Sequence, residues 1–181
     1  MPEYFDRYIN LVGDVELLDA FDDSLEQLKN LDFKLLEELD GVAYAPDKWT
    51  VKTVFQHITD FERILCYRAL LFARGDTNLR RGIDENLLAQ TARADGRTIE
   101  SLVAELKSVR QASRSLFANF DDETLRRTGM NWKYEVSVLA MGFNIIGHQI
   151  HHLDIIRERY YPLVQKQIKE RHFSMAFKKK G

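Results

Sequence analysis

The chain has 181 residues, 45% of them hydrophobic and 30% charged, a balance that is typical of one folded domain and excludes a disordered chain. The net charge of −2 divides into +5 for residues 163–181 and −7 for the rest, and an acidic body excludes a broad nucleic-acid-binding surface. The single cysteine, Cys66, excludes an internal disulfide and a cysteine-rich metal site, and every apolar run is too short to cross a membrane.

The first residues, MPEYFDRYIN, lack the charged start and the continuous apolar stretch of a signal peptide, so we expect a cytoplasmic protein. We predict one bundle domain over residues 1–162 and a basic tail over residues 163–181. A charge run such as this tail is usually solvated, so we expect no membrane or nucleic-acid partner.

Four long segments repeat apolar residues every three or four positions, which is typical of amphipathic helices. The predicted helices cover residues 14–39, 50–74, 98–120 and 137–160. Asp32 is the one polar residue on the apolar side of the first helix, and the last helix is expected to stop before Pro162. Short helical turns are predicted at 85–92 and 122–126, and residues 131–136 form at most a short turn or ribbon. Four antiparallel helices, each with one apolar face, predict an all-α four-helix bundle.

Three of the five histidines fall within GHQIHHLDII, residues 147–156. On a helix, His148 and His152 continue an apolar line, whereas His151 lies on a polar line with Asn144 and Glu158. His148 and His152 are one turn apart, the spacing at which two imidazoles of an HExxH motif bind one ion. We therefore expect these two to point into the bundle and His151 to lie at its edge or in solvent.

Two imidazoles hold a metal poorly, because catalytic zinc sites use about three protein ligands. The best third ligand is His57, between Val54 and Phe61 on the inner face of the second predicted helix. Cys66 is about half a turn out of phase with His57 and should face away. The alternative is three hydrogen-bonded core histidines, but one metal ion would satisfy three ring nitrogens at once. Zinc fits imidazole ligands most easily, and nickel, iron or manganese also fit.

Asp60, three residues after His57, is a candidate to orient an imidazole or to act as a base, and its alternative role is a salt bridge with Arg63. Glu62 points elsewhere and is expected at the surface, and Trp49 is expected to cap the second helix. The side chains that could line a pocket mouth are Tyr44, Tyr67 and Arg68.

Gly142 and Gly147 lie inside the last predicted helix, where each costs about 1 kcal/mol relative to alanine. Close helix packing explains Gly142. Two explanations stay open for Gly147, close packing and room for a ligand beside His148.

Three stretches carry a family resemblance: YAPDKWTVKTVFQHITDFERIL at 44–65, YRALLFARGD at 67–76 and GHQIHHLDIIRERY at 147–160. Together they resemble the DinB/YfiT-like metal-binding helical bundles, and the resemblance covers nearly everything up to Tyr161. It implies a three-histidine metal site at His57, His148 and His152, an unusual crossed connection between helices, and often a homodimer.

The resemblance also implies two reactions, the transfer of a low-molecular-weight thiol to an electrophile and metal-dependent hydrolysis. An ion with an open position would activate either a thiol or water. We predict a metal-dependent thiol S-transferase-like enzyme with a small-molecule substrate. A hydrolase and a non-catalytic metal-binding stress-response module are the alternatives.

Overall fold

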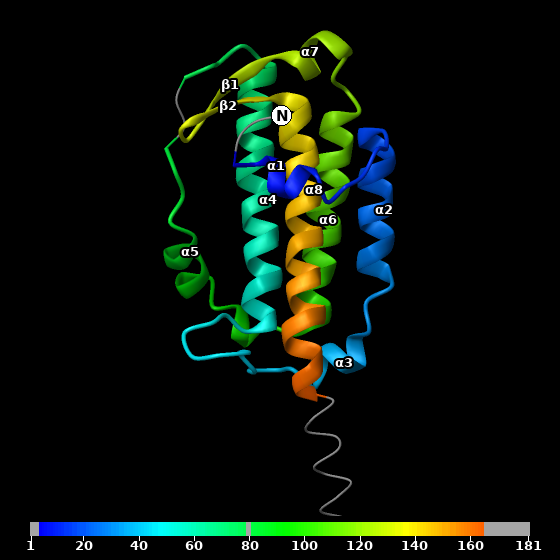
Figure 1. Cartoon of the computed structure of the whole chain (residues 1–181), viewed down its shortest axis with the longest axis vertical. Coiled ribbons are helices and arrows are strands. Elements are labelled where there is room, and N and C mark those ends of the chain that lie inside the picture. The colour runs from blue at the N-terminus through cyan, green and yellow to red at the C-terminus, as the bar shows by residue number, and fades with distance from the viewer. Residues whose placement is uncertain (1–3, 79–80, 165–181) are drawn as a thin grey trace, which may run out of the picture.

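Four long helices stand side by side in the computed structural model, which describes residues 4–78 and 81–164 (Figure 1). They are α2 (Leu17–Lys29), α4 (Val51–Ala73), α6 (Ile99–Phe117) and α8 (Val138–Ile155). The predicted all-α four-helix bundle is confirmed. Most of the predicted basic tail, residues 165–181, lies outside the described residues. No helix in the described ranges is long and apolar enough to cross a membrane.

The helices do not simply alternate in direction. Figure 1 shows α4 and α6 running the same way, because the segment between them, with α5 (Glu85–Thr91), returns along the side of the bundle. Both α2 and α8 run opposite to that pair. Each of α4 and α2 packs against both α6 and α8. The expectation of four antiparallel helices is therefore wrong, and the crossed connection that the resemblance implied is present.

Hydroxyl side chains start three of the long helices. Thr50, Thr98 and Ser137 each accept a hydrogen bond from the backbone N–H three residues later. Such caps satisfy amide groups that have no partner within the helix. The predicted starts of these helices agree with the structure to within one residue.

The first predicted helix is two helices. After α2 ends, α3 (Phe33–Glu37) begins anew, and the Asp32 carboxylate accepts a hydrogen bond from the Leu35 N–H at 3.1 Å. The prediction of one helix over 14–39 is wrong because the polar residue on its apolar side is a cap. A short aspartate side chain competes for backbone amides and so favours a helix start over a helix interior.

The last helix does not stop before Pro162. A wide turn, Ile156–Tyr160, follows α8, the Tyr161 N–H donates to the Ile156 carbonyl, and helical backbone continues through Val164. Proline lacks an N–H and its ring crowds the carbonyl four residues earlier, so a wider turn in front of it accommodates the ring. Val164 is consequently buried in the core.

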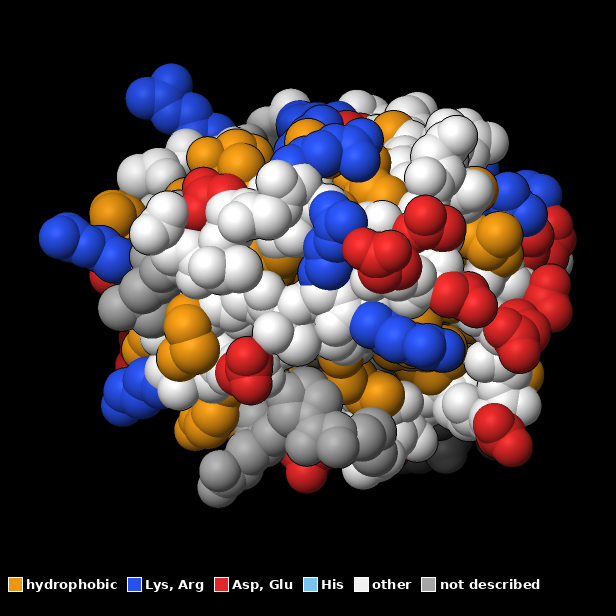
Figure 2. Space-filling model, turned by 90° about the horizontal axis from the view of Figure 1, so that it is seen from above, with side chains coloured by type: hydrophobic (Ala, Val, Ile, Leu, Met, Phe, Trp, Pro, Cys, Tyr) orange, Lys and Arg blue, Asp and Glu red, His pale blue; other side chains and the backbone are white. Residues whose placement is uncertain are grey.

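Short elements close the end of the bundle near the start of α8. They are α7 (Asp122–Arg126) and the hairpin of β1 (Thr128–Asn131) with β2 (Tyr134–Ser137). Two further short elements lie elsewhere: α1 (Asp6–Ile9) packs across α8, and η1 (Ala94–Gly96) lies near the start of α6. The strands pair antiparallel, with Thr128 opposite Ser137. The predicted ribbon and both predicted helical turns are confirmed, whereas α1 had no prediction. Figure 2 shows basic and acidic side chains interspersed on this end.

A buried ion pair joins α4 to α6 inside the bundle. The Arg110 guanidinium donates to both carboxylate oxygens of Glu62, with Nε to Oε1 at 2.9 Å, and the Ser113 hydroxyl lies 2.7 Å from Oε1. Glu62 is 1% exposed and Arg110 0% exposed. The prediction of a surface Glu62 is wrong, because five residues on a helix turn its side chain away from His57 towards α6.

Candidate metal centre

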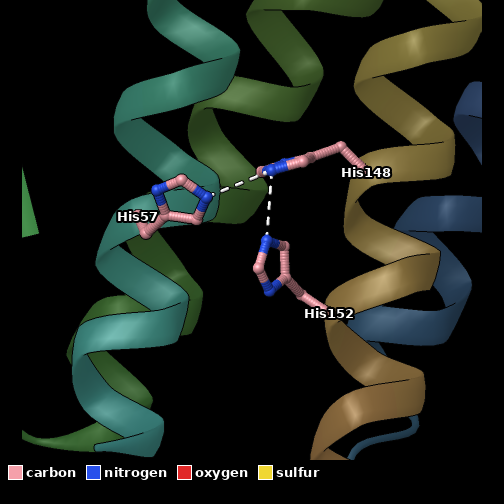
Figure 3. Close-up of side chains that lie close together, drawn as sticks. All are labelled: His57, His148 and His152. Carbon is pink, nitrogen blue, oxygen red and sulfur yellow. Dashed lines mark hydrogen bonds between the residues drawn. The ribbon is translucent and has the colours of Figure 1, made fainter. Parts of the chain in front are cut away.

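Three imidazoles from two helices converge in the bundle (Figure 3). His57 lies in the first half of α4, and His148 and His152 lie in the second half of the antiparallel α8. The Nε2 atom of His148 is 3.1 Å from Nε2 of His57 and 3.1 Å from Nε2 of His152. One ring nitrogen from each residue lies within 4.8 Å of the other two. The structure thus brings together the three residues that the sequence predicts.

Hydrogen bonds alone do not explain these contacts. Each imidazole nitrogen has one in-plane site, which holds either a hydrogen or a lone pair. Nε2 of His148 can therefore form one good hydrogen bond, yet it has two neighbouring nitrogens at 3.1 Å. Nitrogens bound at about 2.05 Å to one tetrahedral ion lie about 3.3 Å apart, close to both distances. The donor set fits a shared divalent metal better than a hydrogen-bonded core.

Burial keeps the three rings uncharged. It lowers the pKa of His57 to about 4 and that of His152 to about 2. At His152, charge repulsion from His57 and His151 lowers the pKa further, by a smaller amount than burial does. Burial also lowers the pKa of His148 well below its usual value. Neutral imidazoles are the form that binds metal, so at neutral pH the cluster needs no deprotonation before a cation binds.

Aromatic rings surround the cluster. The Phe61 ring stacks on His148 with centroids 4.3 Å apart, and the Trp49 ring lies 4.7 Å from that of His57. Trp49 was expected to cap the helix, but Thr50 does so, and Trp49 instead packs against a candidate ligand. From α1, Tyr8 presents its ring to both His148 and His151 at 5.3 Å. These rings fix the imidazoles and reduce the water around them.

Gly147 resolves the choice left open by the sequence in favour of close packing. A Cβ atom there would lie 2.0 Å from the Tyr8 carbonyl oxygen and 2.5 Å from its carbonyl carbon. The backbone of α1 therefore crosses α8 at a point where only glycine fits. This crossing holds Tyr8 over the cluster. Sequence reasoning missed Tyr8, and the interior glycine beside His148 was the available signal.

Replacing Gly147 with alanine should lift α1 from α8 and lower the free energy of unfolding by about 1–3 kcal/mol, which denaturant titration would measure. Gly142 is the matched control. The atoms nearest a Cβ there are side-chain atoms, a Leu17 methyl at 2.9 Å and a Phe117 ring carbon at 3.0 Å, which can shift more easily than the backbone that faces Gly147. Gly142→Ala should therefore cost less, and equal losses at both positions would contradict a special crossing at Gly147.

Other predicted residues lie apart from the cluster. Asp60 accepts a hydrogen bond from Gln56 at 2.9 Å and lies 3.5 Å from Arg63, so the structure contains the salt bridge that was its alternative role. Cys66 faces Ser113 at 3.1 Å, and burial raises the pKa of its thiol to about 12. The orienting role of Asp60 stays a prediction, because the polar partners of its carboxylate in the described residues are Gln56 and Arg63.

The structure agrees with only some of the remaining predictions about individual residues. His151 is partly buried, as expected for an edge position, but Asn144 on the same predicted polar line is only 1% exposed. Tyr44 packs against Tyr160 with ring centroids 5.1 Å apart, and Tyr67 is 61% exposed. Of the three residues proposed for a pocket mouth, Arg68 lines a cavity that also contains Phe61.

Comparison with known proteins identifies the family of this chain and a structure with the same fold. YfiT from Bacillus subtilis, described as a probable metal-dependent hydrolase with an unusual four-helix bundle topology, matches with a TM-score of 0.66. The match covers 92% of this chain and 89% of that chain at 18% identity, which shows the shared fold. No curated protein matches the sequence. Residues 16–156 match the DinB superfamily, a span that exceeds half of the chain and includes all three converging histidines, and the chain therefore belongs to that superfamily.

Proposed function

We propose that the protein is a metal-dependent hydrolase of small molecules, with zinc held by His57, His148 and His152. The observation that carries the proposal is the position of the His148 Nε2 atom, 3.1 Å from both other ring nitrogens. The YfiT description as a probable metal-dependent hydrolase supports it. Three imidazoles are also the ligand number of catalytic zinc sites, which keep a position open for water or substrate.

A divalent metal in such a site lowers the pKa of water and polarises the oxygen of a carbonyl or phosphoryl group. The protein's own residues contribute position and surroundings. Burial holds the three histidines neutral, Phe61 and Trp49 pack against two of the rings, and Tyr8 covers His148. Apolar rings around the cluster lower the local dielectric, which strengthens every electrostatic interaction there.

Thiol S-transfer is the second candidate. The rings of Tyr8, Trp49 and Phe61 give the cluster an apolar lining that suits the soft sulfur of a thiolate. A thiol also ionises far more readily than water, so it needs less assistance from a neighbouring base. The two reactions share the same three ligands and differ in the nucleophile.

One assay with two substrate sets tests both candidates. Zinc-loaded protein is incubated with 4-nitrophenyl esters, and separately with a thiol and 1-chloro-2,4-dinitrobenzene. We expect ester hydrolysis that falls to the buffer rate after chelation and in His152→Ala, but persists in His151→Ala. Conjugate without hydrolysis would favour S-transfer. Neither product from the zinc-loaded protein, with the metal confirmed by elemental analysis, would contradict an enzymatic role for these substrate classes.

A further inference from the structure

A second cavity adjoins the histidine cluster. It has a volume of about 210 Å³. Apolar side chains form much of its wall, namely Tyr4, Phe5, Phe61, Ile83 and Trp132. The Phe61 ring belongs to both places, because it lines the cavity and stacks on His148 with ring centroids 4.3 Å apart. A ligand in the cavity would therefore contact the ring that packs on a candidate metal ligand.

Two of the wall residues have an unusual backbone conformation. Tyr4 has a φ of +74° and Trp132 a φ of +60°, in the left-handed region that bulky residues rarely adopt. Trp132 is the first residue of the two-residue loop that joins β1 to β2, a position at which such a φ favours glycine. Strained backbone is concentrated at binding and catalytic sites and persists where neighbouring contacts hold it. The hairpin thus places an indole at the cavity in a turn that glycine would fit with less strain.

Neighbouring groups hold the rings of Tyr4 and Trp132 in place. The centroids of these two rings are 5.5 Å apart, and the Tyr4 ring stacks on that of Tyr134 at 5.7 Å. The Arg7 guanidinium lies over the Tyr4 ring, 4.1 Å from its centroid. The backbone of Gly82 approaches the indole so closely that a Cβ atom there would lie 3.2 Å from Cδ1 of Trp132. The wall is thus formed before a ligand binds, which reduces the entropy that binding must overcome.

The charged groups of the cavity are opposite in sign. The Arg68 guanidinium donates to the Arg81 carbonyl at 2.7 Å and to the Asn131 side-chain oxygen, so protein groups already engage it. Glu85, an exposed residue, contributes a carboxyl to the lining. An ion that entered the cavity would lose water and meet one group of each sign, so no net opposite charge would offset its desolvation. The lining therefore favours a neutral ligand.

The size and walls of the cavity suit one or two aromatic rings. An apolar cavity of about 150 Å³ is large enough to bind benzene, and this cavity is larger. Aromatic rings favour offset stacking and edge-to-face contacts with one another, which adds to the gain from burying their area. The wall offers such contacts at Tyr4, Phe61 and Trp132.

We propose that this cavity binds a neutral aromatic group of one or two rings between Tyr4, Phe61 and Trp132. The proposal rests on the proposed function only for the role of this group, which is the part of the substrate beside the reacting bond. The substrate then extends past Phe61 from the cavity to the histidines. Binding of the aromatic group itself requires no metal.

Calorimetric titration of the full chain with 2-naphthamide and three analogues tests the proposal. The analogues are decahydronaphthalene-2-carboxamide, in which both rings are saturated, the anion 2-naphthoate and the cation 2-naphthylmethylammonium. We expect 2-naphthamide to bind about 2–10-fold more tightly than its saturated analogue, because it gains ring–ring contacts. It should bind at least about tenfold more tightly than either ion, because an ion is costly to desolvate. Its affinity should be the same in metal-free and zinc-loaded protein.

Three results of these titrations would overturn the proposal. Tighter binding of the saturated amide would contradict an aromatic site, and tighter binding of either ion would contradict a neutral one. Binding of 2-naphthamide only in the presence of zinc would place the ligand on the histidines.

Magnetic resonance locates the ligand without altering the cavity. The chain has two tryptophans, of which Trp132 lines the cavity and Trp49 packs against His57. Titration with 2-naphthamide should shift the indole N–H signal of Trp132 and leave that of Trp49 in place. A shift confined to Trp49 would put the ligand beside the histidines and refute the proposed site.

A variant that fills the cavity and a matched control complete the test. Ile83→Trp should weaken 2-naphthamide binding at least about tenfold, because the added rings occupy the space of the ligand. Ile150→Trp adds the same bulk in a separate cavity of about 400 Å³ and should leave the affinity unchanged. Equal affinities in the two variants would overturn the proposal. Because this binding requires neither metal nor turnover, the cavity and the proposed hydrolysis can fail independently.

Discussion

Replacing His148 with alanine is expected to abolish stoichiometric zinc binding. The Nε2 atom of His148 lies 3.1 Å from Nε2 of both other histidines. Its loss therefore leaves two ligands, His57 on α4 and His152 on α8. Loss of a residue that only supports a ligand lowers metal affinity about 10–100-fold, and loss of a ligand should exceed about 100-fold. Competition with a chromophoric chelator would measure the affinity, and elemental analysis after gel filtration would give the stoichiometry.

His151 provides the matched control. It is also an imidazole on α8, and its ring lies 5.2 Å from that of His152, but it is outside the converging set. His151→Ala should bind zinc within a fewfold of the unaltered protein. Stoichiometric zinc in His148→Ala, or equal losses in both variants, would contradict the three-histidine centre. Circular dichroism of both variants would show that the helices remain.

Replacing Glu62 with glutamine should lower the free energy of unfolding by about 3–5 kcal/mol, because Arg110 would keep its charge in the core without a counter-ion. The pair is buried on both sides, with side-chain exposures of 1% and 0%. A loss of this size is a large fraction of the stability of an ordinary domain. Urea titration would measure it.

An exposed pair of the same kind is the control. Asp22 and Arg114 join α2 to α6 at 2.6 Å, with side-chain exposures of 50% and 37%. Asp22→Asn should cost less than about 1 kcal/mol, because water screens that pair. If Glu62→Gln does not fold, the double variant Glu62→Leu with Arg110→Met remains informative, since removing both charges should restore stability. A Glu62→Gln variant as stable as Asp22→Asn would contradict this account.

The bundle was predictable because apolar spacing reports which face of a helix is buried. Spacing does not report where a polar side chain ends a helix or enters the core. Asp32 interrupts the apolar line of the first predicted helix, and the structure uses it as the cap of α3. Glu62 resembles a surface residue until Arg110, 48 positions later, is placed opposite it. The direction of α6 depends on the path of the long connection after α4, and the spacing of apolar residues in that connection does not indicate its path.

The histidine centre was predictable for a related reason. Helical phase places His148 and His152 on one line and His57 on an inner face, so two antiparallel helices were enough to bring them together. The surroundings were not predictable in the same way. Tyr8 reaches the cluster from a four-residue helix with no amphipathic pattern, and Phe61 serves as both a core residue and a ring against His148.

Because α1 crosses α8 at Gly147, the surroundings of the histidine centre are formed by residues from both ends of the described chain. The Tyr8 carbonyl and Gly147 are separated by almost the whole bundle in sequence, and closing so long a loop is slow because its entropy must be lost first. During synthesis the ribosome must release α8 before Tyr8 can reach His148. The four helices can therefore begin to associate before the aromatic cover over the histidines closes.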